Sequence, residues 1–72
     1  MDDYTKAIAA RVNAYVRNEN TTKDALADAL EIGRSTFYSR LSGERGWLFD
    51  EVVRISKKFG CTVDELMTMP NC

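Results

Sequence analysis

Apolar residues recur at helical spacing along most of the chain, and each run ends at a glycine, a proline or a polar break. No segment alternates apolar and polar residues over the length of a strand, so the pattern predicts an all-α chain. The first run predicts a helix of about four turns that ends near residues 18–20, and its apolar stripe consists of Tyr4, Ile8, Val12, Tyr15 and Val16.

Residues 22–43 predict two short helices that are joined by a tight turn. Thr22 has the side chain of an N-cap for the first of them, and Asp24 favours the positive end of its dipole. The turn falls at residues 31–33, and the next helix runs from Arg34 to about residue 41, after which Gly43 ends it. The inward-facing residues of the pair are Leu26, Ala27, Leu30, Ile32 and Phe37.

Two further helices complete the pattern. The fourth is closed by Gly60, and its apolar face holds Leu48, Val52, Ile55 and Phe59, flanked by Phe49 and Val53. Thr62 and Glu65 form a capping-box pattern that begins a last short helix, which Pro70 stops. Trp47 is expected in the core between the third and fourth helices, and base stacking is its alternative role. We therefore expect a single domain over residues 1–72, built as a compact bundle of about five short helices.

Composition narrows the class of protein. Hydrophobic residues make up 44% and charged residues 29% of the chain, as in an ordinary globular domain. No stretch approaches the roughly 20 apolar residues that cross a bilayer, and the N-terminus lacks the apolar core of a secretory signal. The chain has no histidine, and no motif of an active site is present, so we expect no enzyme, no metal and no cofactor. Cys61 is interpreted as a small buried hydrophobe and Cys72 as an exposed tail residue.

Charge is unevenly distributed in this chain, whose net charge is −1. Residues 32–47 hold Arg34, Arg40 and Arg45 against Glu44, which gives a local charge of +2. Residues 1–31 hold four basic and six acidic side chains, which gives a local charge of −2. The total argues against indiscriminate binding to nucleic acid, whereas a local basic segment is compatible with a site-specific binder.

The segment LADALEIGRSTFYSRLSG and its continuation WLFDEVVRISKKFGCTVDELM resemble the helix-turn-helix of the phage-repressor/Cro (Xre-like) family over about residues 22–67. The resemblance implies a lambda-repressor-like bundle whose third helix, residues 34–41, enters the major groove of a double-stranded DNA operator. It implies a small phage or bacterial transcriptional regulator in the cytoplasm of a bacterial or phage-infected cell. The chain departs from the family at Glu31, where glycine is usual in a turn with positive φ, and at Gly33, where a Ser or Thr N-cap is usual.

The resemblance assigns base contacts to four residues of the third helix. Arg34 is the strongest candidate, because a guanidinium can pair bidentately with N7 and O6 of guanine; the alternative is a solvated arginine whose charge opposes the helix dipole. Ser35 and Ser39 match base-reading positions, although serine on an exposed face needs no functional explanation. Tyr38 is expected either to touch a thymine methyl group or a phosphate, or to cover the edge of the core.

Phosphate contacts are assigned by the same resemblance to Thr22, Lys23, Thr36, Arg40, Ser42 and Arg45. Thr22 and Lys23 open the second helix, where N–H groups would meet a phosphate. The alternative is an N-cap beside a surface lysine, and the two roles are compatible for Thr22. Ser42 and Arg45 match a second phosphate-contacting loop. Arg40 stands where the family often has an apolar residue, so its stem is expected to pack while its head reaches a phosphate.

Two classes of function fit the sequence. The first is sequence-specific DNA binding, for which two copies on half-sites about 34 Å apart are a hypothesis from geometry. Residues 67–72 are a candidate contact between the copies, and burial of this tail within one chain is the alternative. The alternative is a protein-interaction module of the same fold, such as an antirepressor or an antitoxin-like regulator. The overall acidity and the placement of Glu31 and Glu44 favour this alternative. Neither function requires a membrane or a small-molecule substrate.

Overall fold

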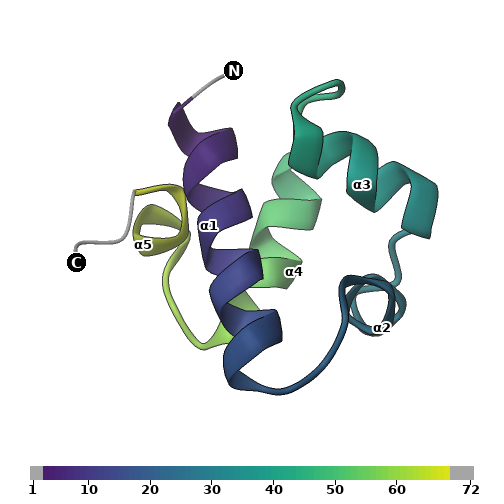
Figure 1. Cartoon of the computed structure of the whole chain (residues 1–72). Coiled ribbons are helices and arrows are strands. Elements are labelled where there is room, and N and C mark those ends of the chain that lie inside the picture. The colour runs from purple at the N-terminus through teal and green to yellow at the C-terminus, as the bar shows by residue number, and fades with distance from the viewer. Residues whose placement is uncertain (1–2, 69–72) are drawn as a thin grey trace.

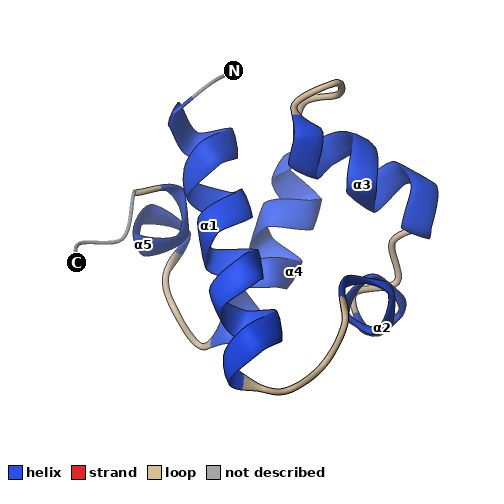
Figure 2. Cartoon of the chain, viewed as in Figure 1, coloured by secondary structure: helices blue, strands red, loops and turns tan. Residues whose placement is uncertain are grey.

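The computed structural model describes residues 3–68, and this range contains helices and no strand (Figure 2). The helices are α1 (Asp3–Asn18), α2 (Lys23–Ala29), α3 (Arg34–Ser42), α4 (Phe49–Phe59) and α5 (Val63–Met67). Helix α1 contacts α2, α3 and α5, and α4 packs against α5 (Figure 1). The predicted all-α bundle of about five short helices is therefore confirmed. No helix within the described residues combines the length and the apolar character that a membrane crossing requires.

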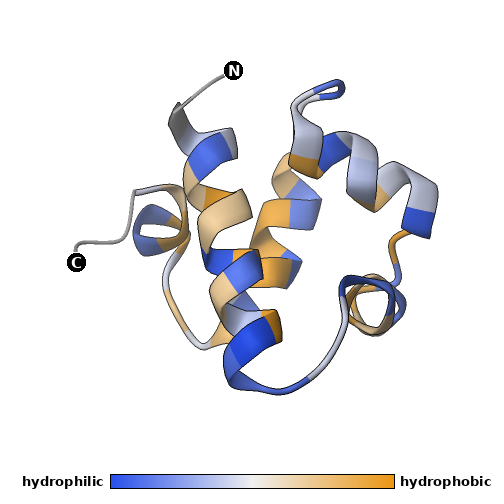
Figure 3. Cartoon of the chain, in the orientation of Figure 1, coloured by the Kyte–Doolittle hydropathy of each residue, from blue (hydrophilic) through white to orange (hydrophobic). Residues whose placement is uncertain are grey.

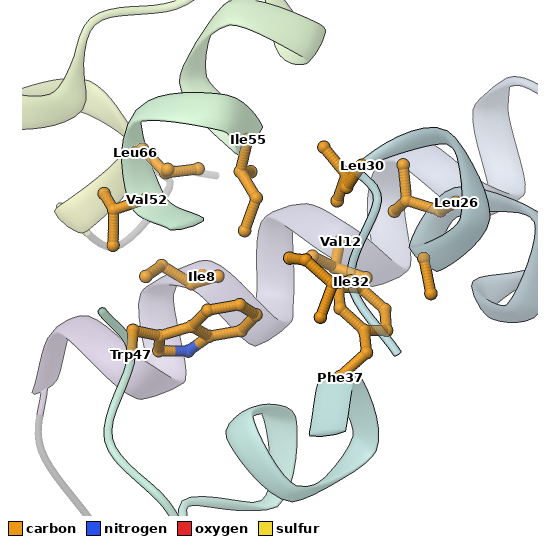
Figure 4. Close-up of a cluster of buried hydrophobic side chains, with 11 residues drawn as sticks. Ile8, Val12, Leu26, Leu30, Ile32, Phe37, Trp47, Val52, Ile55 and Leu66 are labelled. Atoms are coloured by element: carbon orange, nitrogen blue, oxygen red, sulfur yellow. The ribbon is translucent and has the colours of Figure 1, made fainter. Parts of the chain in front are cut away.

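One apolar cluster connects all five helices (Figure 4). Phe37 is the buried residue of α3, and its ring meets that of Trp47 edge to face with the centroids 5.9 Å apart. Trp47 is 8% exposed, so its predicted place in the core is confirmed. All inward-facing residues that the sequence predicted for the α2–α3 segment are buried, namely Leu26, Ala27, Leu30, Ile32 and Phe37.

The helix ends follow the local signals of the sequence. Thr22 Oγ1 accepts a hydrogen bond from the Ala25 N–H at 3.1 Å, as an N-cap does. Thr62 Oγ1 accepts from the Glu65 N–H at 3.0 Å, while a Glu65 carboxylate oxygen accepts from the Thr62 N–H at 2.9 Å. This is the predicted capping box. Gly43 ends α3 in the left-handed conformation, with φ 85°.

The turn between α2 and α3 keeps its predicted place, and its backbone is strained at Glu31. Glu31 has φ 60°, in the left-handed region that costs a residue with a side chain about 1–2 kcal/mol. Gly33 is the N-cap of α3 and makes no side-chain hydrogen bond there. Arg54 of α4 donates to the carbonyl oxygens of Leu30, at 3.2 Å, and Glu31, at 3.4 Å. These carbonyls lie at the end of α2, so Arg54 supplies partners that the helix itself lacks.

The predicted start of the fourth helix is wrong by one residue. Helix α4 begins at Phe49, and Leu48 is its extended N-cap, whose N–H donates to Glu51 at 3.0 Å. Leu48 is 56% exposed and Phe49 is 75% exposed, so neither belongs to the buried apolar face. Leu48 is extended and precedes the helix, so it does not share the inward face, whereas Val52 and Ile55 are buried and Phe59 packs against the core as predicted.

The structure describes Cys61 and only the first part of the C-terminal tail, residues 67 and 68. Cys61 is half-buried and packs against the core, so its expected burial is confirmed in part. Met67 is 37% exposed. Pro70, Cys72 and most of the segment that was expected to contact a second copy lie outside the described residues.

Candidate nucleic-acid interface

Helix α3 crosses α2 steeply and lies at one side of the bundle: in Figure 1, α2 is seen nearly end-on while α3 extends across the picture. At about 100° per residue, one stripe on the side away from Phe37 holds Ser35, Ser39 and Ser42, and Arg34 and Tyr38 lie along one edge of this stripe. All of these are exposed except Ser39, which is half-buried. The ribbon of α3 is mainly white and blue in Figure 3, as expected for a polar helix. The structure thus places the four predicted base-reading residues on one face.

Asp28 of α2 holds the Arg34 side chain, and Asp24 lies near it. Arg34 Nε donates to Asp28 Oδ1 at 3.2 Å, and Nη2 donates to Asp28 Oδ2 at 2.6 Å. Arg34 Nη1 also lies 3.8 Å from Asp24 Oδ2. The hydrogen bond from Arg34 lowers the pKa of Asp28, and the same bond raises the pKa of Arg34. The side chains of Arg34 and Asp28 are both 57% exposed, so the pair adds little net stability to the fold.

Tyr38 joins the same cluster one turn further along α3. Its hydroxyl donates to Asp24 Oδ1 at 2.9 Å, and this hydrogen bond raises the pKa of Tyr38. The Tyr38 ring also meets that of Phe37 edge to face, with the centroids 6.4 Å apart. Because Tyr38 remains 45% exposed, it covers the edge of the core and still presents a surface to a ligand.

The predicted phosphate-contacting residues fall into two groups. Lys23 and Ser42 line a shallow groove between α1, α2 and α3, beside Tyr38. Ser42 Oγ donates to the Ser39 carbonyl at 3.1 Å, which fixes its orientation at the end of α3. Arg45 follows in the exposed loop. Thr22 serves as an N-cap and is exposed, which confirms its capping role and leaves its phosphate contact a prediction.

Arg40 and Thr36 lie on the other side of α3, roughly opposite Tyr38. Arg40 Nε is 2.8 Å from Glu51 Oε1, and the two side chains are only 12% and 9% exposed. Thr36 is half-buried. The ion pair favours a structural role for Arg40 over the phosphate contact that was expected of it, and Thr36 lies away from the polar stripe.

The local charge of +2 over residues 32–47 does not persist on the folded surface. Arg34 faces Asp24 and Asp28, and Arg40 faces Glu51, all of which lie outside that segment. Lys23 in the groove and Arg45 in the loop after α3 form no ion pair within the described residues. No sequence signal could show this cancellation, because it depends on how the helices cross.

No family model, curated protein or solved structure matches the chain. The case for any function therefore depends on the residues of the α3 face and on their surroundings.

Proposed function

We propose that the chain is a small sequence-specific DNA-binding regulator of the helix-turn-helix type, which inserts the outer face of α3 into the major groove. The observation that carries the proposal is the division of α3 into two sides. Its core side contributes Phe37 as the buried residue, and its outer side presents a continuous polar stripe. A helix fits the major groove, and hydroxyl and guanidinium groups match the donors and acceptors on base edges.

Each residue of the stripe has a distinct task in this proposal. Arg34 pairs with guanine, Ser35 and Ser39 exchange hydrogen bonds with neighbouring bases, and the Tyr38 ring contacts a thymine methyl group. Lys23, in the groove beside the stripe, holds a phosphate, as does Arg45 in the loop after α3. Two copies on half-sites about 34 Å apart would double this small contact area.

The charges of the folded surface limit the non-specific part of the binding. With Lys23 and Arg45 as the phosphate-contacting cations, log K should fall with log salt concentration at a slope of about −2 per chain. Two chains on one operator should give a slope of about −4. Affinity should therefore depend mainly on base contacts, which makes the protein selective at a modest total affinity.

Selection of sites from a random pool of duplex DNA tests the proposal, followed by mobility shifts over a salt series. We expect enrichment of a half-site that contains a guanine. Arg34→Ala should weaken binding to the selected site by about 10- to 100-fold and relax the preference at one base pair. Lys23→Ala should weaken binding to all sequences alike. Lys57→Ala is the matched control, because it removes the same charge from an exposed position of α4 and should change little.

A protein-interaction module is the second candidate, and two observations favour it. Asp24 and Asp28 neutralise the charge of Arg34 on the proposed DNA side. Leu48 and Phe49 place two large apolar side chains side by side in the sequence and exposed at the start of α4. If the selection enriches no sequence over random DNA, the DNA-binding proposal fails and this candidate takes its place.

A further inference from the structure

Two pairs of side chains link α2 to α3 at the proposed interface. Asp24 and Asp28 are four positions apart on α2, and Arg34 and Tyr38 are four positions apart on α3, so each pair lies along one side of its helix. Asp28 contacts Arg34, and Asp24 contacts Tyr38. A solvated arginine would need neither of these contacts. They occupy part of the Arg34 guanidinium and leave part of it free.

Asp28 uses one edge of the Arg34 guanidinium and leaves another open. A guanidinium has five N–H donors, and Asp28 engages one on Nε and one on Nη2. Nη1 is 3.8 Å from Asp24, which is too long for a hydrogen bond. The edge formed by Nη1 and the second hydrogen of Nη2 is thus available, and such a fork is the one that guanine N7 and O6 accept end-on.

The contact with Asp28 also makes Arg34 less attractive to phosphate than to guanine. Arg34 with Asp24 and Asp28 forms a group of net charge −1, which repels phosphate. The acceptors of guanine are neutral and depend on the direction of the donors rather than on net charge. Holding the side chain by its Nε edge also restricts its rotamers before DNA arrives, so less freedom is lost on binding.

We propose that Asp28 is a positioning residue for specificity: it aims the free edge of Arg34 at guanine and suppresses contact between Arg34 and phosphate. This inference rests on the proposed DNA-binding function. The charge of Asp28 by itself would only oppose binding to DNA. The proposal gives Asp28 a role in recognition through its contact with Arg34.

Asp28→Asn tests the proposal, with affinities measured for the selected duplex and for a random duplex of equal length. The amide keeps the shape of the side chain but loses the charge and the two-oxygen acceptor. We expect tighter binding to the random duplex, a salt slope steeper by about 1, and a selected-to-random affinity ratio at least about tenfold lower. Asp64→Asn, an exposed acid at the start of α5, is the matched control for net charge and should leave the ratio unchanged.

A double variant separates positioning from general repulsion. If Asp28 acts through Arg34, the fall in the affinity ratio caused by Asp28→Asn should disappear when Arg34→Ala is already present. An unchanged ratio in Asp28→Asn, or an equal fall in the Arg34→Ala background, would overturn the positioning role. Wild-type protein that selects no sequence would instead refute the proposed function, so the two failures are distinguishable.

Discussion

Replacing Arg40 with methionine should destabilise the fold without weakening DNA binding by the folded protein. Arg40 Nε contacts Glu51 Oε1 at 2.8 Å, and Nη2 lies 3.4 Å from Oε2. The side chains are 12% and 9% exposed. Glu51 also accepts the Leu48 N–H at 3.0 Å, which ties it to the start of α4. Methionine fills the space of the arginine stem but leaves the carboxylate buried with the Leu48 N–H as its remaining partner.

The size of the loss follows from the burial of this pair. Removing one partner of a buried ion pair costs about 3–5 kcal/mol. Because both side chains keep some exposure to water, we expect a loss at the lower end, about 3 kcal/mol. A domain of 72 residues has a total stability of about 4–11 kcal/mol. The melting temperature should therefore fall by about 12–24 °C. Glu51→Gln should cost less, about 1–2 kcal/mol, because the arginine head can shift toward water and the amide oxygen still accepts from Leu48.

Denaturant unfolding of the two single variants and the Arg40→Met/Glu51→Gln double variant checks the argument. The double variant buries no unpaired charge, so its loss should be at least about 2 kcal/mol smaller than the sum of the single losses. Losses that add to within about 0.5 kcal/mol would refute the coupling that we infer from the geometry. If folded Arg40→Met bound DNA more weakly than wild type, the phosphate contact that the sequence predicted for Arg40 would be supported instead of the purely structural role.

Three further changes test individual features of the fold. Glu31→Gly should raise the free energy of unfolding by about 0.5–1 kcal/mol, since glycine removes the strain at φ 60° but adds freedom to the unfolded chain; a loss on denaturant unfolding would contradict this. The Thr62 N–H lowers the pKa of Glu65, so the resulting stability should be present above the ordinary glutamate pKa and lost as the pH falls through the lowered value. Unfolding of wild type and Glu65→Gln over a pH series should show this acid-dependent difference, and parallel curves would exclude it. Phe49→Ser should change stability by no more than about 0.5 kcal/mol in thermal unfolding, because Phe49 is 75% exposed; a loss above 1 kcal/mol would show that its ring is packed.

Much of the fold was predictable because its signals are local. The N-caps at Thr22 and Thr62 and the helix end at Gly43 involve atoms within a few positions of one another. Apolar spacing located the buried side of the α2–α3 segment for the same reason. The place of Leu48 on the apolar face of α4 was predicted wrongly, since a periodic pattern does not reveal at which residue an extended segment becomes a helix.

The candidate site was predictable only in part. The resemblance assigned Arg34, Ser35 and Tyr38 to base contacts, and in the structure all three are exposed on α3. The contacts of Arg54 with the Leu30 and Glu31 carbonyls were not predicted, because they join residues more than 20 positions apart. DNA binding by the α3 face stays a prediction, which site selection and the Arg34→Ala variant test.

The sequence by itself determined approximately where the helices lie and most of the apolar side chains they bury, because hydrogen bonds and apolar spacing within a helix depend on near neighbours. Only the tertiary structure decided the partners of the charged residues. Asp28 meets Arg34 and Glu51 meets Arg40 because of the way in which helices pack, and no spacing along the chain encodes that arrangement. A segment that is basic in the sequence thus becomes nearly neutral on the folded surface, since opposite charges from neighbouring helices are brought to within hydrogen-bond distance.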